Sequence, residues 1–416
     1  MAKILVIAKR HNLYNFFMLC FSVCAFVNTS VARTFVFKPV VAQALYSDTA
    51  NWENRQYPGL QIEYGDTIVF ESNGNYQQVI IDTNIIVRGY CHVKDSVYWM
   101  VPANTNITFQ GLLYESIIER ERLKANTTSE VTVAGKLFFN GAGATLLGIA
   151  NISGNIVSDA DVENALYQQK MSLKKAVVSG TVSGIGLQLS ADSLAVDSSA
   201  VITIHSGYNM NGGSLNATFL HNKGKINLLY ETQLTSNTIQ NSGVINAGAI
   251  TGQITNDGTI EVLQFPSNGF TANIHDVINT GTIKLYGSIY APLMINGVNN
   301  EGVFQISDYL NEASANTWVT IEGMVLNTNQ WIQTGTAAVA HMQGEYANAG
   351  NCYINGKTFF NSGIFTNNAV CVFSASTMTP AFQLANEFVN NGTLTFYGKV
   401  ILSGQLKNYG TLNFNN

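Results

Sequence analysis

Paired acidic residues are the first candidates for chemistry in this chain, because glycoside cleavage needs two convergent carboxyl groups. The nearest candidates are Asp308 with Glu312 and Asp257 with Glu261. Both pairs are more simply interpreted as turn and surface residues. We therefore predict no catalytic residue and no enzymatic activity. A secreted carbohydrate-active enzyme, a polysaccharide lyase or hydrolase, is kept as the alternative hypothesis.

The remaining motifs give no metal or cofactor site. The histidines that follow residue 32 are isolated, without partners two or four positions away, so the spacing of a zinc site is missing; they are His92, His205, His221, His275 and His341. Gly-x-Ser-x-Gly and phosphate-binding loops are also missing. No arginine follows Arg122, which leaves most of the chain without a clamp for uronic carboxylates. We predict neither a metal nor a cofactor.

A short phrase recurs in the second half: Asn, one spacer, Gly, one spacer, then an aliphatic or aromatic residue. Its copies begin at Asn222, Asn241, Asn256, Asn279, Asn300, Asn361, Asn390 and Asn408. The first five copies lie 19, 15, 23 and 21 residues apart, which is about one coil of a parallel β-solenoid. Gly accepts a positive φ at a turn, and the alternation that follows each Gly is typical of a strand.

This period predicts an all-β fold, a right-handed parallel β-helix (β-solenoid) whose stacked coils share one core. Asn side chains at equivalent points of successive coils can form a ladder of amides. The alternative is a set of antiparallel hairpins in a sandwich or barrel, which would give turn signals every 8–12 residues. The dominant period is about twice as long and favours the solenoid.

Residues 1–32 have the features of a secretory signal peptide. A basic start, an apolar run over 16–27 and the small-x-small site Ser30-Val31-Ala32 predict that the mature chain begins at Arg33. The apolar run is too short for an uncleaved membrane anchor, so we predict a secreted protein with no membrane span after signal removal. The signal holds three of the 21 basic residues and none of the 26 acidic ones, which leaves a net charge of −8. This sparse acidic balance argues against nucleic acid or anionic membrane as a partner.

Two regions follow the signal. Residues 33–130 hold Trp52 and Trp99 and are expected to form an N-terminal cap with the first coils, since a solenoid needs its first coil shielded. Residues 131–416 are the β-helix repeats. One or two short flanking helices are expected: Ser158–Lys175 has the caps and the single apolar face of an amphipathic helix, and Glu115–Lys124 is a charge-dense short helix or exposed loop.

Cys352 and Cys371 are 19 residues apart, one coil length. On stacked coils they would lie about 4.8 Å apart, a separation that a disulfide accepts, and a secreted protein meets an oxidising compartment. The alternative is two small apolar residues in one interior ladder. Cys91 is then the odd thiol.

Five glycosylation sequons follow the signal: Asn106, Asn126, Asn151, Asn216 and Asn391. We expect occupancy at Asn106, Asn126 and Asn216 before the others. Asn391 lies inside the repeat phrase, where a laddered amide cannot carry a glycan.

The phrases, secretory start, low charge and capped β-helix plan resemble the N-terminal domain of fungal hyphally regulated cell-wall proteins and related yeast wall adhesins. The similarity covers residues 33–416, and the degenerate motif also looks like bacterial filamentous haemagglutinin repeats. The resemblance implies a surface-displayed β-helix on a Ser/Thr-rich stalk that is linked to wall glucan through a processed lipid anchor. This sequence departs from that plan, because neither stalk nor anchor signal occurs in its 416 residues.

These observations favour a secreted cell-surface or cell-wall glycoprotein with a non-catalytic, ligand-presenting β-helix that serves adhesion or wall structure. The expected partners are cell-wall glycans, or surface ligands of a host or a neighbouring cell. A bacterial-type secreted adhesin is a variant of this hypothesis, which absence of N-glycans on the native protein would favour.

Overall fold

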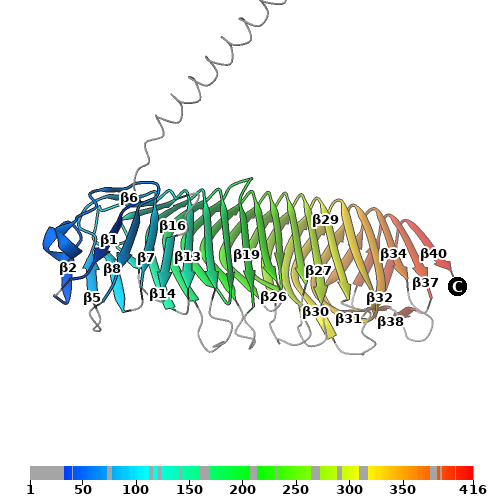
Figure 1. Cartoon of the computed structure of the whole chain (residues 1–416). Helices are drawn as coiled ribbons and strands as arrows, with labels where there is room; N and C mark the ends of the chain where they lie inside the picture. The colour runs from blue at the N-terminus through cyan, green and yellow to red at the C-terminus, as the bar shows by residue number, and fades with distance from the viewer. Residues whose placement is uncertain are drawn as a thin grey trace, which may run out of the picture.

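The chain forms a rod of stacked parallel β-strands (Figure 1). The computed structural model describes residues 32–39, 41–72, 77–94, 96–111, 116–119, 123–140, 143–159, 169–206, 213–229, 232–263, 272–287, 293–308, 317–374, 382–384, 387–398 and 400–415. Within them, every pairing between named strands is parallel and joins one coil to the next. The predicted all-β solenoid is confirmed.

One face of the rod, the first face, is a single ladder from β1 to β40. Its strands are β1 (Thr34–Phe37), β4 (Thr67–Phe70), β7 (Tyr90–Val93), β10 (Ser116–Glu119), β13 (Lys136–Asn140), β15 (Asn155–Asp159), β17 (Thr181–Ile185), β19 (Val201–His205), β21 (Lys225–Leu229), β23 (Val244–Ala247), β25 (Thr259–Leu263), β27 (Thr282–Gly287), β29 (Val303–Asp308), the starts of β31 (Gln330–Asn348) and β32 (Asn351–Ser362), β34 (Val370–Ser374), β37 (Thr393–Tyr397) and β40 (Thr411–Asn415).

The second and third faces begin as separate short strands. The second face starts with β2 (Gln43–Leu45), β5 (Gln77–Ile80), β8 (Val97–Val101) and β11 (Leu123–Ala125). The third face starts with β3 (Gln61–Ile62), β6 (Ile85–Val87), β9 (Ile107–Phe109) and β12 (Glu130–Val133).

From β14 onward, one long strand runs along both of these faces in each coil, because β14 pairs with β11 and then with β12. The long strands are β14 (Gly143–Ile152), β16 (Gln169–Val178), β18 (Gln188–Val196), β20 (Ser214–Asn222), β22 (Gln233–Asn241), β24 (Ala249–Asn256), β26 (Ala272–Asn279), β28 (Leu293–Asn300), β30 (Thr317–Asn327) and β31. Towards the C-terminal end the two faces separate again, into β35 (Phe382–Leu384) and β38 (Val400–Leu402) on the second, and β33 (Ile364–Asn367), β36 (Glu387–Asn390) and β39 (Gln405–Asn408) on the third.

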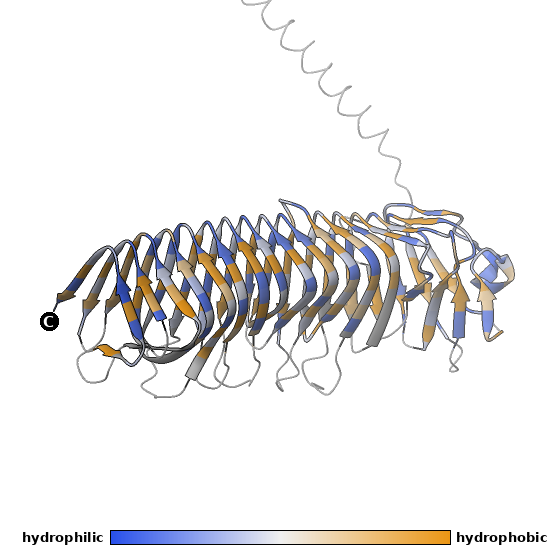
Figure 2. Cartoon of the chain, turned by 180° about the vertical axis from the view of Figure 1, so that it is seen from behind, coloured by the Kyte–Doolittle hydropathy of each residue, from blue (hydrophilic) through white to orange (hydrophobic). Residues whose placement is uncertain are grey.

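Each strand alternates buried and outward residues, so one apolar core runs inside the stack. Figure 2 shows this alternation as changing hydropathy along the strands. In the first-face ladder, Ile226, Ile245 and Ile260 stack in register and are fully buried. Because one coil cannot bury its own apolar side, the stacking itself supplies the core.

The predicted flanking helix at Ser158–Lys175 is wrong for the part that the structure describes. Ser158 and Asp159 end β15, and residues 169–175 belong to β16, in register with β14 and β18. Residues 160–168 lie outside the described residues. Met171 and Leu173 are both buried, which is the period-two pattern of a strand, so stacking on neighbouring coils overrides the local helical pattern.

The charge-dense segment at Glu115–Lys124 is not a helix or a loop where the structure describes it. Its described residues form β10 and the start of β11, while 115 and 120–122 lie outside the described residues. In the described part of the chain, helical geometry is confined to the short 3-10 turns η1 (Thr49–Asn51) and η2 (Glu53–Arg55).

An aromatic cluster fills the N-terminal end of the rod. The Trp52 ring makes edge-to-face contacts with Phe37 at 5.0 Å and with Tyr46 at 5.3 Å between centroids. Its indole Nε1–H donates to the Tyr46 carbonyl at 2.9 Å, and the Tyr46 hydroxyl donates to the Gly59 carbonyl at 2.9 Å. These contacts place large apolar rings over the first coil while their polar atoms keep partners.

An asparagine ladder ends the third face in each later coil. The Nδ2 atom of each Asn donates to the Oδ1 atom of the next, at 2.6–2.8 Å, through Asn222, Asn241, Asn256, Asn279, Asn300, Asn327, Asn348, Asn367, Asn390 and Asn408. Each donor from Asn222 to Asn390 also reaches a main-chain carbonyl in the following coil, for example Val303 from Asn279 at 3.0 Å. The predicted amide ladder is confirmed.

The glycines of the phrase serve close approach rather than a positive φ. At Gly243, a Cβ would lie 2.1 Å from the carbonyl oxygen of Gly224 in the preceding coil, and the same holds at Gly258 against Gly243 at 2.2 Å. Positive φ, which we expected there, occurs at none of Gly224, Gly243 and Gly258. At these two corners a side chain would push the coils apart, whereas the corners after Asn327 and Asn367 hold Asn329 and Ala369.

One copy of the phrase was assigned to the wrong corner. The ladder passes from Asn348 directly to Asn367 at 2.8 Å and does not include Asn361. Gly363, two residues after Asn361, has φ +88° and precedes β33 on the third face. The ladder instead uses Asn327, Asn348 and Asn367, whose following residues depart from the phrase.

Candidate interaction surface

The carboxylate candidates lie apart from any described acid–base cluster. Asp257 is exposed in the turn after Asn256, and Glu261 lies on β25, in register with Lys284 of β27. Asp308 is the last residue of β29, and Glu312 lies outside the described residues. Within the described ranges, no three His, Cys, Asp or Glu residues gather where they could hold a metal ion.

The two candidate cysteines are direct neighbours. Cys352 of β32 and Cys371 of β34 are in register on adjacent coils, and both side chains are buried and unbonded in the structure. The Tyr346 hydroxyl donates to the Cys352 Sγ atom at 3.5 Å. Burial raises the pKa of the Cys371 thiol well above its ordinary value, which favours its protonated form in the folded chain. The disulfide therefore stays a prediction, with its register requirement met.

The sequon asparagines differ in exposure and in the hydrogen bonds of their side-chain amides. Asn106, Asn126 and Asn216 are exposed. Asn151 is half-buried and its Nδ2 atom donates to the Glu130 carboxylate. Asn391 is exposed and outside the ladder, because Asn390 occupies the ladder position.

A charge-free surface covers the first face of the last six coils. The strand segments 303–307, 330–334, 351–355, 370–374, 393–397 and 411–415 contain no Asp, Glu, Lys, Arg or His. Two charged residues border it: Asp308 ends β29, and Lys284 of β27 lies in register with Gln305. We call the outward residues of these segments the neutral face.

The outward residues of the neutral face form three straight columns. They are Val303, Gln330, Asn351, Val370, Thr393 and Thr411 in the first, Gln305, Ile332, Tyr353, Val372, Thr395 and Asn413 in the second, and Ser307, Thr334, Asn355, Ser374, Tyr397 and Asn415 in the third. Residues within a column recur at the strand spacing, so the neutral face extends about 24 Å along the rod. The result is a regular array of amides, hydroxyls, aliphatic groups and two tyrosine rings, in which Ser307 and Thr395 are covered by their neighbours.

Several side chains of the neutral face present unburied surface. Tyr353 is 40% exposed, Val370 43% and Tyr397 45%. Cross-coil bonds fix part of the array: the Ser307 and Thr334 hydroxyls lie 2.8 Å apart, and the Asn413 amide donates to the Thr395 hydroxyl at 3.3 Å. Exposed rings on a rigid sheet offer apolar contact, while neighbouring amides and hydroxyls offer hydrogen bonds.

The core behind the neutral face is stiffened by stacked rings. Phe304 and Trp331 stack with centroids 4.6 Å apart in one column. In a second column Phe373 stacks on Phe396 at 5.4 Å, and Phe396 on the exposed Phe414 of the last coil at 5.5 Å. Side chains packed in this way leave the sheet above them little freedom to bend. The outward array is therefore preorganised.

Charged residues of the same coils lie on the other faces. Glu387 of β36 and Lys407 of β39 form an exposed ion pair at 2.7 Å on the third face. On the second face, His341 of β31 lies in register with Thr320 of β30, and Glu322 of β30 lies in register with Gln343 of β31. Earlier coils of the first face also carry charge, as at Glu261 and Lys284. The charge-free surface is thus limited to the first face and to the C-terminal end of the rod.

None of the neutral-face residues was singled out from the sequence. The signal that could have found them is the absence of charge at every outward position of successive strand segments after residue 302. That signal becomes visible only when the register of the coils is known.

Comparison with protein-family models, with curated proteins and with solved structures finds no match to this chain. Among the described residues, no helix is both long and apolar enough to cross a membrane.

Proposed function

We propose that this chain is a secreted cell-surface or cell-wall protein that binds neutral cell-wall polysaccharide through the neutral face, without catalysis. The observation that carries the proposal is the run of six stacked coils whose outward first-face residues are all uncharged. Adhesion to a wall, or cohesion within one, is the role that such a surface serves.

Charge complementarity argues for a neutral partner. A basic polymer would find no carboxylate and an acidic polymer no cation on this face, whereas a polymer of sugar hydroxyls meets amides and hydroxyls at each coil. Tyr353 and Tyr397 add rings against which a flat sugar face can pack. The regular spacing of the columns suits an extended, repeating ligand better than a compact one.

Rigidity supports the same conclusion. Because the neutral face is fixed by main-chain pairing and by stacked rings beneath it, binding does not have to order the protein side. Once one unit of a repeating polymer is bound, its neighbouring units are held close to the next coils, so many weak contacts together raise the overall affinity. Surface ligands of a host or neighbouring cell remain partners of the same proposal only where they present neutral glycans.

The test is depletion of purified secreted protein by insoluble β-glucan, chitin and mannan, with plant polysaccharides as comparison. We expect binding to at least one neutral polymer, little change between low and high salt, and about tenfold weaker binding for Tyr353→Ala and Tyr397→Ala, the loss of one good contact. Tyr64→Ala is the matched control, since Tyr64 is 51% exposed in the turn between β3 and β4. Equal loss for the control would contradict the proposal, and so would release of soluble oligosaccharide, which would support a carbohydrate-active enzyme.

A further inference from the structure

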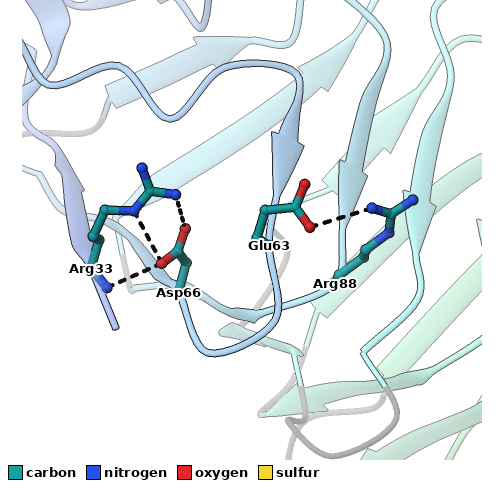
Figure 3. Close-up of polar contacts among 4 residues, drawn as sticks. All are labelled: Arg33, Glu63, Asp66 and Arg88. Carbon is teal, nitrogen blue, oxygen red and sulfur yellow. Dashed lines mark hydrogen bonds and ion pairs between the residues drawn. The ribbon is translucent and has the colours of Figure 1, made fainter. Parts of the chain in front are cut away.

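Asp66 gathers three donors from a single residue, Arg33 (Figure 3). The Arg33 main-chain nitrogen lies 3.1 Å from Oδ1, the guanidinium Nε 3.3 Å from Oδ1, and a terminal guanidinium nitrogen 2.6 Å from Oδ2. The Asp66 side chain is only 5% exposed, whereas that of Arg33 is 61% exposed. A nearly buried carboxylate thus faces the main-chain nitrogen of the residue at which the sequence predicts the mature chain to begin.

The same residue starts the stacking of the rod. The Thr67 amide donates to the Arg33 carbonyl at 2.8 Å, and Thr34 follows in register with Thr67. Asp66 therefore holds Arg33 at the point where β1 begins to pair with β4. A stronger interaction between the Arg33 nitrogen and Asp66 therefore stabilises the first hydrogen bonds between β1 and β4.

We propose that the Arg33–Asp66 site is a docking site for the mature N-terminus, formed when a signal-processing protease cleaves between Ala32 and Arg33. Water is the co-reactant: the Ala32 carbonyl carbon gains its hydroxyl, the C–N bond breaks, and the Arg33 nitrogen takes up hydrogen to become an ammonium group. The neutral amide donor beside Asp66 is thereby replaced by a cation. This inference rests on the secretion included in the proposed function.

The charges around the site favour this additional cation. Asp66 and Glu63 both lie between β3 and β4. Asp66 is bonded to Arg33, whereas Glu63 points to the Arg88 guanidinium, 3.3 Å away, and attracts Arg33 only as a more distant charge (Figure 3). In the uncleaved chain, two carboxylates and two guanidinium groups balance. Cleavage adds one positive charge next to the carboxylate that is nearly buried, and so turns an amide-to-carboxylate hydrogen bond into one between two opposite charges.

The experiment compares the secreted protein with a variant that carries Gly-Ser inserted between Ala32 and Arg33. The residues before the cleavage site are unchanged, so the variant keeps an amide at Arg33 and moves its ammonium two residues away. Intact mass defines each N-terminus, and amide hydrogen exchange at pH 7 reports opening at Thr67–Phe70. We expect the native chain to begin at Arg33 and these amides to exchange about tenfold faster in the inserted variant.

Two further variants make the result specific. In an Asp66→Asn background the insertion should have no effect on exchange, because the partner of the ammonium group is gone. Glu63→Gln is the matched control and should keep the effect of the insertion. A chain that begins elsewhere, equal exchange with and without the insertion, or an effect that persists in Asp66→Asn would overturn the inference. Failure of secretion itself would appear as a retained leader in the mass, and would count against the proposed function as well.

Discussion

The Asn222 amide donates to Asn241 at 2.7 Å, yet its own Oδ1 atom has no hydrogen-bond partner, because Val196 occupies the same position in the preceding coil. The column continues upstream as aliphatic and aromatic residues, such as Val178 and Ile152. One interior column is thus apolar in the early coils and amide-lined in the later ones. The change falls between β18 and β20.

Removing an amide from the middle of the ladder should be far more damaging than removing one at its end. Asn300→Ala takes the acceptor from Asn279 and the donor from Asn327, all buried, so we expect a loss of about 2–4 kcal/mol in the free energy of unfolding. Asn408→Ala, at the exposed end, should cost under about 1 kcal/mol. Urea denaturation measures both, and similar losses would argue against the ladder as a stabilising element.

Replacing a glycine that follows a ladder asparagine with alanine should destabilise the fold. Gly258→Ala would place a Cβ 2.2 Å from the Gly243 carbonyl oxygen, and we expect a loss of about 1–3 kcal/mol through separation of the coils. The reverse change, Ala369→Gly, serves as the control, because Ala369 already occupies the equivalent position after Asn367. Thermal unfolding of the two variants should differ clearly; a tolerated Gly258→Ala would refute the close-approach argument.

The secreted protein should contain one reactive thiol after denaturation without reductant. Register and burial place Cys352 against Cys371, and an oxidising compartment favours their bridge, which leaves Cys91. Alkylation under denaturing conditions followed by intact mass measurement counts the free thiols. Three modified cysteines would rule out the bridge and leave two small side chains in an interior column.

Glycan occupancy should be low where the sequon nitrogen is bonded to a neighbouring coil. We expect glycans at the exposed Asn106, Asn126 and Asn216, where the Asn216 Nδ2 atom donates to Ser214 of its own strand at 3.1 Å. We expect none at Asn151, whose Nδ2 atom is bonded to Glu130 of the preceding coil. At Asn391 the Nδ2 atom donates to Asn368 at 2.8 Å, so occupancy there should also be low. Enzymatic deglycosylation in heavy-oxygen water, followed by peptide mass spectrometry, marks each occupied site. Full occupancy at Asn151 would contradict this order.

The sequence predicts the stacked architecture well because the corner residues repeat. Asn279 and Gly281 are required by contacts between coils, so their spacing reveals the coil. The phrase did not identify Asn327 and Asn367, because the ladder needs only the asparagine amide. The glycine position of the phrase is occupied by Asn329 after Asn327 and by Ala369 after Asn367. The same tolerance allowed Asn361 to imitate a ladder residue.

Other features depend on neighbours that no single segment contains. Residues 169–175 fit a helix locally but form a strand because β14 and β18 lie on either side. The neutral face depends on register in the same way: Ile332, Tyr353 and Val372 become one column only when their coils are stacked. Arg33 and Asp66, 33 positions apart, meet only at the first corner of the rod.

The direction of the asparagine amides has a consequence for their motion. Each Nδ2 atom points towards the next coil and each Oδ1 atom towards the previous one. If one side chain turned by half a revolution, nitrogen would meet nitrogen on one side and oxygen would meet oxygen on the other. A single amide therefore cannot reverse unless its neighbours reverse with it. All the amides of the ladder keep the same orientation.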